Sequence, residues 1–252
     1  MSLPVSVELC YLSIDESDFD VDLDAALPLL DGDERQRFQK FKVKHPKNCF
    51  LQARRMAKTL LAHKLGCSPA EVRFDYNEHG KPFLKTQSYA AAAEKPLNWH
   101  FNISHSKSMV VVALSQQIVG VDVEDVDRCR SMCDKAEEFL NTHVKTMIDS
   151  CSDVESQAAA FATHWSCMES YVKLYGSAIF NEIRRIEAVL SEKLTMAERY
   201  AYQSTRFTTL PLTPNCRVSL ATEDHYPTIF VSKWSSAGLR ASEFTVEGAV
   251  VS

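Results

Sequence analysis

The amino-acid sequence predicts an α+β fold built from two similar lobes. The chain has 252 residues, which is enough for one large domain or two small ones. Hydrophobic residues make up 45% of the chain and charged residues 24%, a balance typical of a soluble globular protein with a buried core. Both halves mix stretches of helical periodicity with short runs typical of antiparallel strands, and this mixture predicts the two lobes.

The first half begins with a strand and then turns helical. Residues 5–12 start by alternating apolar and polar side chains, which predicts a strand. After the acidic stretch Asp15–Asp24, expected at the surface, Asp31 precedes a helix with acid in its first turn. Residues 50–65 have one apolar face and are followed by Gly66, so a longer helix is expected to end there.

Short elements fill the rest of this half. Ser68 and the proline after it begin a short helix, and residues 72–76 follow as a strand. Residues 80–82 (Gly-Lys-Pro) predict a turn. Residues 109–114 and 118–123 both resemble strands, and the three residues between them predict a hairpin.

The second half repeats this mixture of elements. Residues 130–149 and 154–175 have helical patterns. Strand-like runs return at residues 217–220 and 227–231.

Composition and charge argue against several classes of protein. The formal net charge of −5 does not suit a nucleic-acid binder, and no run approaches the ~20 apolar residues that span a bilayer. The N-terminus lacks a basic segment followed by an apolar one, so a cytoplasmic location is expected. Eight scattered cysteines without a CxxC pair predict reduced thiols and no zinc site.

The strand pattern at residues 120–124 (Gly-Val-Asp-Val-Glu) places two acids on one face. Because side chains alternate along a strand, Asp122 and Glu124 share a face with Gly120, while the valines face a core. Two carboxylates beside an open space suit Mg²⁺, which takes few protein ligands and fills its shell with water and phosphate oxygens. Taken alone, the pair is more often two solvated acids at a strand edge.

The helical pattern at residues 154–175 presents a second group of functional side chains. Trp165, Glu169 and Lys173 lie four residues apart and therefore share a helix face. The same spacing of Glu and Lys also stabilises ordinary surface helices, and a lone Trp is more often a core residue.

Three segments resemble one known family when they are taken together and in order. They are Phe-Asn-Ile-Ser-His-Ser at 101–106, Gly-Val-Asp-Val-Glu at 120–124, and Trp-Ser-Cys-Met-Glu-Ser-Tyr-Val-Lys at 165–173. Sfp-type 4′-phosphopantetheinyl transferases show similar segments in the same order. The resemblance covers roughly residues 30–176, with further support upstream from Glu34–Phe41, Ala53–Arg54, Val72–Phe74 and Asn77–Pro82.

The resemblance implies a particular architecture. Members of this family fold as two α+β lobes related by a pseudo-two-fold axis, the 4′-phosphopantetheinyl transferase fold, with coenzyme A between the lobes. The implied N-terminal lobe comprises residues 1–115 and the C-terminal lobe residues 116–252. Because one chain holds both lobes, a monomer is sufficient.

The resemblance also implies roles for individual residues. Asp122, Glu124 and Glu169 match acids that bind Mg²⁺, and Glu169 is also the candidate catalytic base. Lys173 matches a residue that stabilises charge on the pyrophosphate of coenzyme A. The residues that match further contacts to coenzyme A are Arg37, Arg54, Lys81, Ser104 and His105.

The activity that follows is transfer of the 4′-phosphopantetheine group of coenzyme A to a serine of an apo acyl, peptidyl or polyketide carrier protein, with release of 3′,5′-ADP. Such a transition state needs positioning and neutralisation of charge, which a metal and a lysine supply. The alternatives are a catalytically degenerate protein that binds coenzyme A or a carrier protein, and a magnesium-dependent phosphohydrolase. No nucleic acid or membrane is expected as a partner.

Met168 departs from the family pattern. The family has a lysine immediately before the helix glutamate, and this chain has methionine. Methionine is nearly as good a helix former, so the helix is expected to persist. Because the metal and Lys173 are expected to neutralise the pyrophosphate already, restoring lysine is predicted to change turnover by less than about ten-fold.

Overall fold

The computed structural model describes residues 6–14, 22–85, 98–133, 140, 142–177, 199–202, 204–235 and 250–251. The chain divides into two compact units. The first comprises Met1–Gln117 together with Pro227–Ser252, and the second comprises Ile118–Tyr226.

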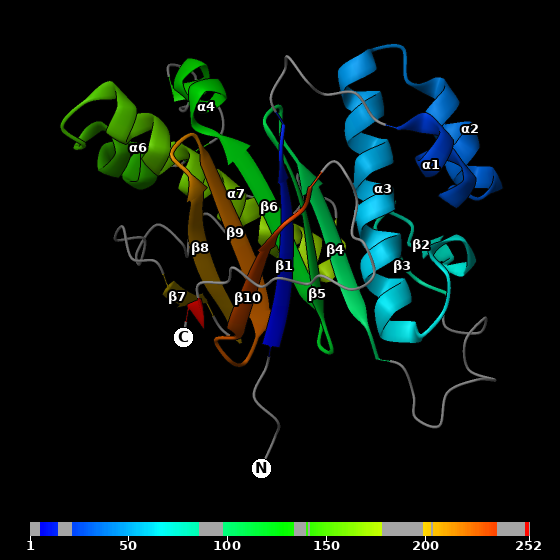
Figure 1. Ribbon diagram of the computed structural model, residues 1–252. Helices are drawn as coiled ribbons and strands as arrows, with labels where there is room; N and C mark the ends of the chain where they lie inside the picture. The colour runs from blue at the N-terminus through cyan, green and yellow to red at the C-terminus, as the bar shows by residue number, and fades with distance from the viewer. Residues whose placement is uncertain are drawn as a thin grey trace. The chain divides into compact units, whose positions relative to one another are not determined.

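A five-stranded sheet forms the centre of the first unit (Figure 1). Its strand order is β11-β10-β1-β5-β4, and neighbouring strands are antiparallel except for β1 and β10, which are parallel. The strands are β1 (Ser6–Ser13), β4 (His100–His105), β5 (Met109–Ser115), β10 (Thr228–Lys233) and β11 (Val250–Val251). A separate two-stranded ladder joins β2 (Phe74–Tyr76) to β3 (Pro82–Leu84).

The helices of the first unit have clear start and stop signals. Helix α2 (Gly32–Lys40) starts after Asp31 with acid in its first turn, as the sequence predicted. Asp31 caps it by accepting from the backbone of Glu34, whose own carboxylate accepts from the backbone of Asp31. Helix α3 (Lys44–Leu65) begins six residues earlier than expected and ends at Gly66, whose φ of 66° is left-handed. The shorter helices are α1 (Leu23–Ala26), η1 (Leu27–Leu29) and η2 (Pro69–Glu71).

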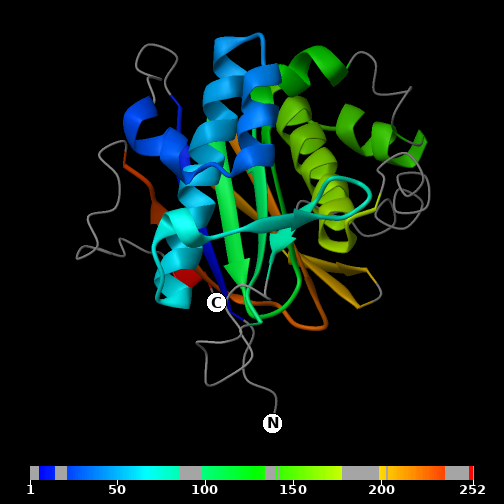
Figure 2. The same cartoon turned by 90° about the vertical axis from the view of Figure 1, so that its right-hand side faces the viewer.

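Helix α3 lies across the face of the sheet near β4 and β5, as Figure 2 shows. Its apolar side chains, among them Met56, Leu60 and Leu61, form one core with residues of β1, β4 and β5. Burial of this stripe is what turns an amphipathic sequence into a stable helix, because isolated helices gain little in water.

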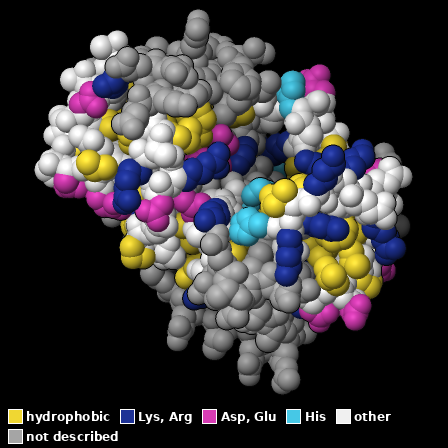
Figure 3. All heavy atoms as spheres, turned by 90° about the horizontal axis from the view of Figure 1, so that it is seen from above, with side chains coloured by type: hydrophobic (Ala, Val, Ile, Leu, Met, Phe, Trp, Pro, Cys, Tyr) yellow, Lys and Arg dark blue, Asp and Glu magenta, His cyan; other side chains and the backbone are white. Residues whose placement is uncertain are grey.

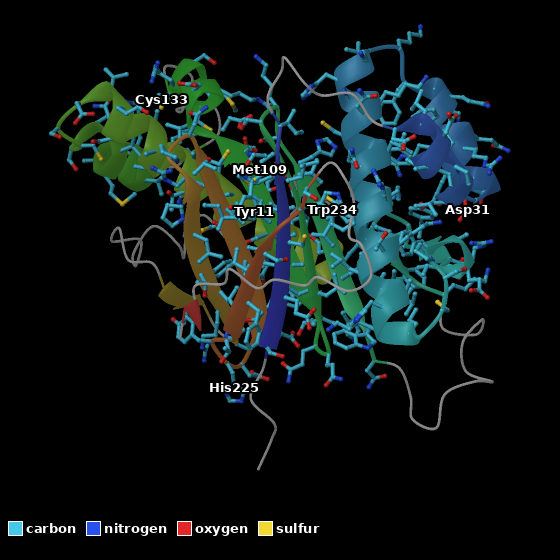
Figure 4. The ribbon with its side chains drawn as sticks, in the orientation of Figure 1. Tyr11, Asp31, Met109, Cys133, His225 and Trp234 are labelled. Atoms are coloured by element: carbon cyan, nitrogen blue, oxygen red, sulfur yellow. The ribbon has the colours of Figure 1, made fainter. Side chains whose placement is uncertain are left out.

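Strand β10, late in the chain, belongs to the first unit. Residues 227–252 were assigned to the C-terminal lobe, but β10 pairs with β1 in the first unit. The backbone N–H of Trp234 donates to the carbonyl of Tyr11 at 2.7 Å, and these two residues lie side by side in Figure 4. Trp234 is buried in the same core as α3, so the two ends of the chain build one unit.

The second unit is an antiparallel sheet with helices packed against it. The strand order is β6-β9-β8-β7, and α7 contacts β6, β9 and β8. The strands are β6 (Val119–Asp125), β7 (Arg199–Tyr202), β8 (Thr205–Thr213) and β9 (Cys216–Glu223), and the helices are α4 (Val126–Cys133), α6 (Thr142–Asp149) and α7 (Val154–Tyr175). Like α3, α7 ends at a left-handed glycine, Gly176.

Two predicted elements differ from the structure. The hairpin expected between residues 109–114 and 118–123 does not form, because β5 pairs with β1 and β4 while β6 pairs with β9. The helix expected over residues 130–149 is described as α4 and α6, and residues 134–139 lie outside the described part of the chain. The helix predicted over residues 154–175 is confirmed as α7.

The reduced thiols predicted for the cysteines agree with the structure. All eight cysteines are free thiols. In the part of the chain that the structure describes, no helix combines the length and the apolar composition that crossing a bilayer requires.

Candidate active site

The two acids of β6 lie in the interior of the second unit. Asp122 is 2% exposed and Glu124 is 8% exposed, so these are not the solvated acids of an open strand edge. The valines that alternate with them, Val121 and Val123, are also buried. Burial of a carboxylate is costly unless a cation or hydrogen bonds compensate it, and therefore the acids need a specific partner.

That partner is helix α7, which approaches β6 most closely at Gly120. A Cβ atom on Gly120 would lie 2.0 Å from the carbonyl oxygen of Ser170 and 2.6 Å from the backbone nitrogen of Leu174. The space that the sequence suggested beside the acids is therefore occupied by the helix backbone. Glycine at this position lets the helix come close enough to place its own charged side chains beside Asp122.

Lys173 contacts one acid of the strand, Asp122, and one acid of the helix, Glu169. Its ammonium nitrogen lies 2.5 Å from Asp122 Oδ1 and 3.7 Å from Glu169 Oε2. The other oxygen of Glu169 accepts from the indole N–H of Trp165 at 3.1 Å. The shared helix face predicted for Trp165, Glu169 and Lys173 thus becomes a chain of contacts that ends at Asp122.

Burial and like charge shift the protonation of these groups. Burial, followed by the charges of Asp122 and Glu169, raises the pKa of Glu124 to about 8. The pKa of Glu169 is also raised, chiefly by burial and then by Asp122. Burial by itself would lower the pKa of Lys173, but Asp122 and Glu169 outweigh it, and the net shift is upward. The second unit therefore holds three crowded carboxyl groups and one firmly protonated amine.

Arg54, predicted to contact phosphate, is buried in the first unit beside a carboxylate. Its Nε lies 3.1 Å from Glu34 Oε1, and its Nη2 is 3.4 Å from the hydroxyl of Tyr76. Lys58 reaches the other oxygen of Glu34 at 2.6 Å and donates to the carbonyl of Leu29 at 2.7 Å. In this arrangement Arg54 and Lys58 hold α2 on α3, and Lys58 also holds η1.

The remaining phosphate-contact candidates are spread over other elements of the first unit. Arg37 is exposed on α2, with its guanidinium carbon 5.7 Å from the ring centre of Phe50. Figure 3 shows Lys and Arg side chains gathered on this end of the unit. Ser104 is buried on β4 and His105 is exposed beside it. Lys81 is half-buried after the β2–β3 turn, and burial lowers its pKa to about 8.

Comparison with known proteins identifies the family. Residues 18–117 match the family described as "4′-phosphopantetheinyl transferase, N-terminal". Residues 118–224 match the "4′-phosphopantetheinyl transferase superfamily". The chain belongs to this superfamily.

Individual phosphopantetheinyl transferases agree with this assignment. The chain is similar to 4′-phosphopantetheinyl transferase HetI from Nostoc, with 29% identity over 64% of this chain and 65% of the relative. It is similar to a phosphopantetheinyl transferase from Thraustochytrium, with 27% identity over 78% and 71% of the two chains. The rat L-aminoadipate-semialdehyde dehydrogenase-phosphopantetheinyl transferase is 28% identical over 72% of this chain and 59% of its own length.

The family implies a divalent metal, and the chemistry of the donor set fits one. Asp122, Glu124 and Glu169 supply hard carboxylate oxygens of the kind that Mg²⁺ prefers. The ammonium of Lys173 already lies on Asp122 and so stands in for a bound cation. Among the described residues, no three acidic, histidine or cysteine side chains are yet arranged around a metal position.

Met168, where this chain departs from the family pattern, lies in a hydrophobic core. Its side chain is fully buried in the cluster that includes Cys129 of α4 and Phe161 of α7. A lysine at this position would have to carry its ammonium out of this core to reach the acids.

Sequence reasoning missed two features of the site. Glu34 was noted only as part of the family resemblance, although its carboxylate holds both Arg54 and Lys58. The spacing of Arg54 and Lys58 by one helical turn indicates that the two cations share a helix face. No pattern in the sequence identifies Glu34 as the acid that both of them contact. The close contact at Gly120 was missed because it depends on a helix 50 residues further along the chain.

Proposed function

We propose that this protein transfers the 4′-phosphopantetheine group of coenzyme A to a serine hydroxyl of an apo carrier protein and releases 3′,5′-ADP. Membership of the family supports this proposal, and the observation that carries it is the joining of Asp122, Glu169 and Lys173 across β6 and α7. This arrangement gathers acids for a metal, a base and a fixed positive charge, which phosphoryl transfer requires.

In this reaction the serine oxygen attacks the β-phosphorus of coenzyme A. A new O–P bond forms while the bond between the β-phosphorus and the bridging oxygen breaks, and 3′,5′-ADP leaves with the bonding electrons. The serine proton goes to the carboxylate of Glu169, which acts as the general base. Trp165 fixes the orientation of this carboxylate through its indole N–H. Lys173 stabilises the negative charge that moves onto the leaving pyrophosphate oxygen.

Asp122, Glu124 and Glu169 would hold the divalent metal, and we propose Mg²⁺. When bound, the metal neutralises charge on the pyrophosphate oxygens. Lys81, His105, Ser104 and Arg37 are proposed to contact the phosphates of coenzyme A. Arg54 is buried against Glu34, and we expect it to act mainly by holding α3 in place.

The carrier protein belongs to the acyl, peptidyl or polyketide class in this proposal. We expect the protein to act as a monomer in the cytoplasm, since one chain supplies both units and the cysteines are free. No nucleic-acid or membrane partner is required for the reaction.

A mass-spectrometric assay tests the proposal. The protein is incubated with Mg²⁺, coenzyme A and an apo carrier protein, and the carrier should gain the mass of one phosphopantetheine group. Glu169→Gln should slow this gain by ~10²–10⁴-fold, because it removes the base while preserving shape. Asp122→Asn should also abolish transfer. Asp149→Asn on α6 is the control, since that exposed acid pairs only with Lys145 at 2.6 Å among the described residues.

The assay also separates the alternatives. Free phosphate without a mass gain on the carrier would indicate a phosphohydrolase. Binding of coenzyme A without either product would indicate a degenerate member of the family. Full transfer activity of Glu169→Gln or Asp122→Asn would contradict the proposed site but not the proposed reaction.

A further inference from the structure

Lys173 occupies an oxygen that the proposed metal needs. Its ammonium nitrogen lies 2.5 Å from Asp122 Oδ1, and the side chain of Asp122 is 2% exposed. Lys173 itself is 28% exposed on its side-chain surface, so the lysine is held at one end and open to solvent elsewhere. A buried carboxylate is thus covered by a flexible cation that lies at the border of the interior.

A metal and this ammonium exclude one another at Asp122. Two positive charges that share one carboxylate oxygen would lie only a few ångströms apart, where repulsion is strong in a poorly hydrated interior. Lysine carries its charge on a flexible four-carbon stem, so its ammonium can turn away while α7 stays in place. Glu169, the second acid that Lys173 reaches, lies one turn away on the same helix, at 3.7 Å.

The carboxylates of Asp122 and Glu169 need a positive charge beside them whether or not metal is present. Asp122 comes from β6 and Glu169 from α7, and helix and strand are held together at Gly120 without any side chain between them. The carboxylates would repel each other across this contact without a cation. Lys173 therefore compensates them in the metal-free protein.

We propose that Lys173 is an internal counter-ion that holds Asp122 until a divalent metal displaces it. This inference rests on the proposed function and adds that the metal binds before Lys173 can act on the pyrophosphate. Metal binding releases the ammonium from Asp122, and only the released ammonium is available to the pyrophosphate. The lysine that assists transfer is thereby withheld until the metal is in place.

The first test measures Mg²⁺ binding to the full-length protein by calorimetry, without coenzyme A or carrier. Lys173→Gln should bind Mg²⁺ at least ~10-fold more tightly than the native protein, because the competing cation is gone. Lys145→Gln is the matched control. Lys145 also pairs with an aspartate from a helix of the second unit, at 2.6 Å and with 29% of its side chain exposed, and its loss should leave Mg²⁺ affinity unchanged.

A second test separates direct contact from general repulsion between charges. If Lys173 holds Asp122, Lys173→Gln should lower the midpoint of unfolding in metal-free buffer, and Mg²⁺ should reverse the loss. The same substitution in an Asp122→Asn background should cost less, because its partner carboxylate is gone. Additive effects of the two substitutions would show that the residues do not interact, and would overturn the proposal.

A third measurement needs no variant at the site and serves if Lys173→Gln fails to fold. Nuclear magnetic resonance of ¹⁵N-labelled lysine side chains should show a Lys173 ammonium signal that is slow to exchange without metal and shifts when Mg²⁺ is added. An unchanged signal at saturating Mg²⁺ would overturn the exchange. Failure of the native protein to bind Mg²⁺ at all would instead contradict the metal of the proposed function.

Discussion

At the scale of single residues, burial decides which charged and polar groups take part in function. Lys173 and Lys58 both reach carboxylates, at 2.5 Å and 2.6 Å, but Lys58 is wholly buried and Lys173 is partly exposed. Only the second can change partner without unfolding its surroundings. Lys58 contributes to the stability of the fold, since breaking a buried ion pair leaves an uncompensated charge in the interior.

Met168 gives a residue-scale prediction on stability. We expect Met168→Lys to lower the free energy of unfolding by about 3–5 kcal/mol, because its ammonium would enter a hydrophobic core. Met168→Leu, which preserves volume, should cost less than about 1.5 kcal/mol. Denaturant titration of both variants measures these values. A Met168→Lys protein as stable as the native one would show that the lysine ammonium leaves this core.

Lys81 gives a residue-scale prediction on pH. Burial lowers the pKa of this amine from its ordinary value to about 8, so the uncharged form accumulates as the pH rises above that value. A phosphate requires the charged form, and coenzyme A affinity should therefore fall by up to ~10-fold per pH unit above about pH 8. Lys81→Arg should remove this dependence because guanidinium stays protonated. Calorimetry from about pH 7 to about pH 9 measures both proteins, and parallel profiles would exclude Lys81 as the phosphate contact.

At the scale of elements, the pairing of β6 with α7 positions the acids. Each element alone carries only part of the group, Asp122 and Glu124 on the strand and Glu169 and Lys173 on the helix. The distance between the elements is set where Gly120 meets Ser170 and Leu174. Anything that widens this contact should separate Lys173 from Asp122.

Gly120→Ala tests this dependence. Its Cβ would lie 2.0 Å from the Ser170 carbonyl oxygen, so α7 must shift, and we expect a loss of about 1–3 kcal/mol in stability together with weaker Mg²⁺ binding. Gly32→Ala is the control, because nothing lies within 4 Å of a Cβ at that position. Unfolding midpoints and calorimetry report the two effects. Unchanged Mg²⁺ affinity in Gly120→Ala would show that the acids do not depend on this contact.

At the scale of the whole molecule, the chain returns to its first unit after completing the second. Strand β10 pairs in parallel with β1, and Trp234 is 3% exposed in the core beneath α3. A segment beyond the end of the family match at residue 224 therefore stabilises the unit formed by the start of the chain.

Trp234→Ala tests whether this late segment stabilises the first unit. Removing a buried indole costs about 3–5 kcal/mol, and the loss should appear in the first unit. Phe230→Ala, on the strand that directly precedes Trp234, is the control, because Phe230 is 41% exposed and its removal should cost far less. Hydrogen exchange locates the effect, with faster exchange expected in β1 and α3 and unchanged exchange in α7. Equal losses for the two variants would contradict a core role for Trp234.

The sequence by itself determined the long helix of the second unit, the family and the candidate acids. Helix α7 was predicted with the observed bounds because helical periodicity is a local signal, and in the structure Asp153 and Gly176 cap its two ends. The acids of residues 120–124 and the face shared by Glu169 and Lys173 follow equally from the period of a strand and of a helix.

Only the tertiary structure decided what those residues touch. The pairing of Lys173 with Asp122, the commitment of Arg54 to Glu34 and the burial of Met168 all join segments far apart in the chain or depend on what packs against a helix. The hairpin predicted around residue 116 was wrong for the same reason, since β5 pairs with β1 and β6 pairs with β9 in a different sheet. Periodicity tells which side of an element is buried, whereas the identity of the neighbour depends on packing that no local pattern records.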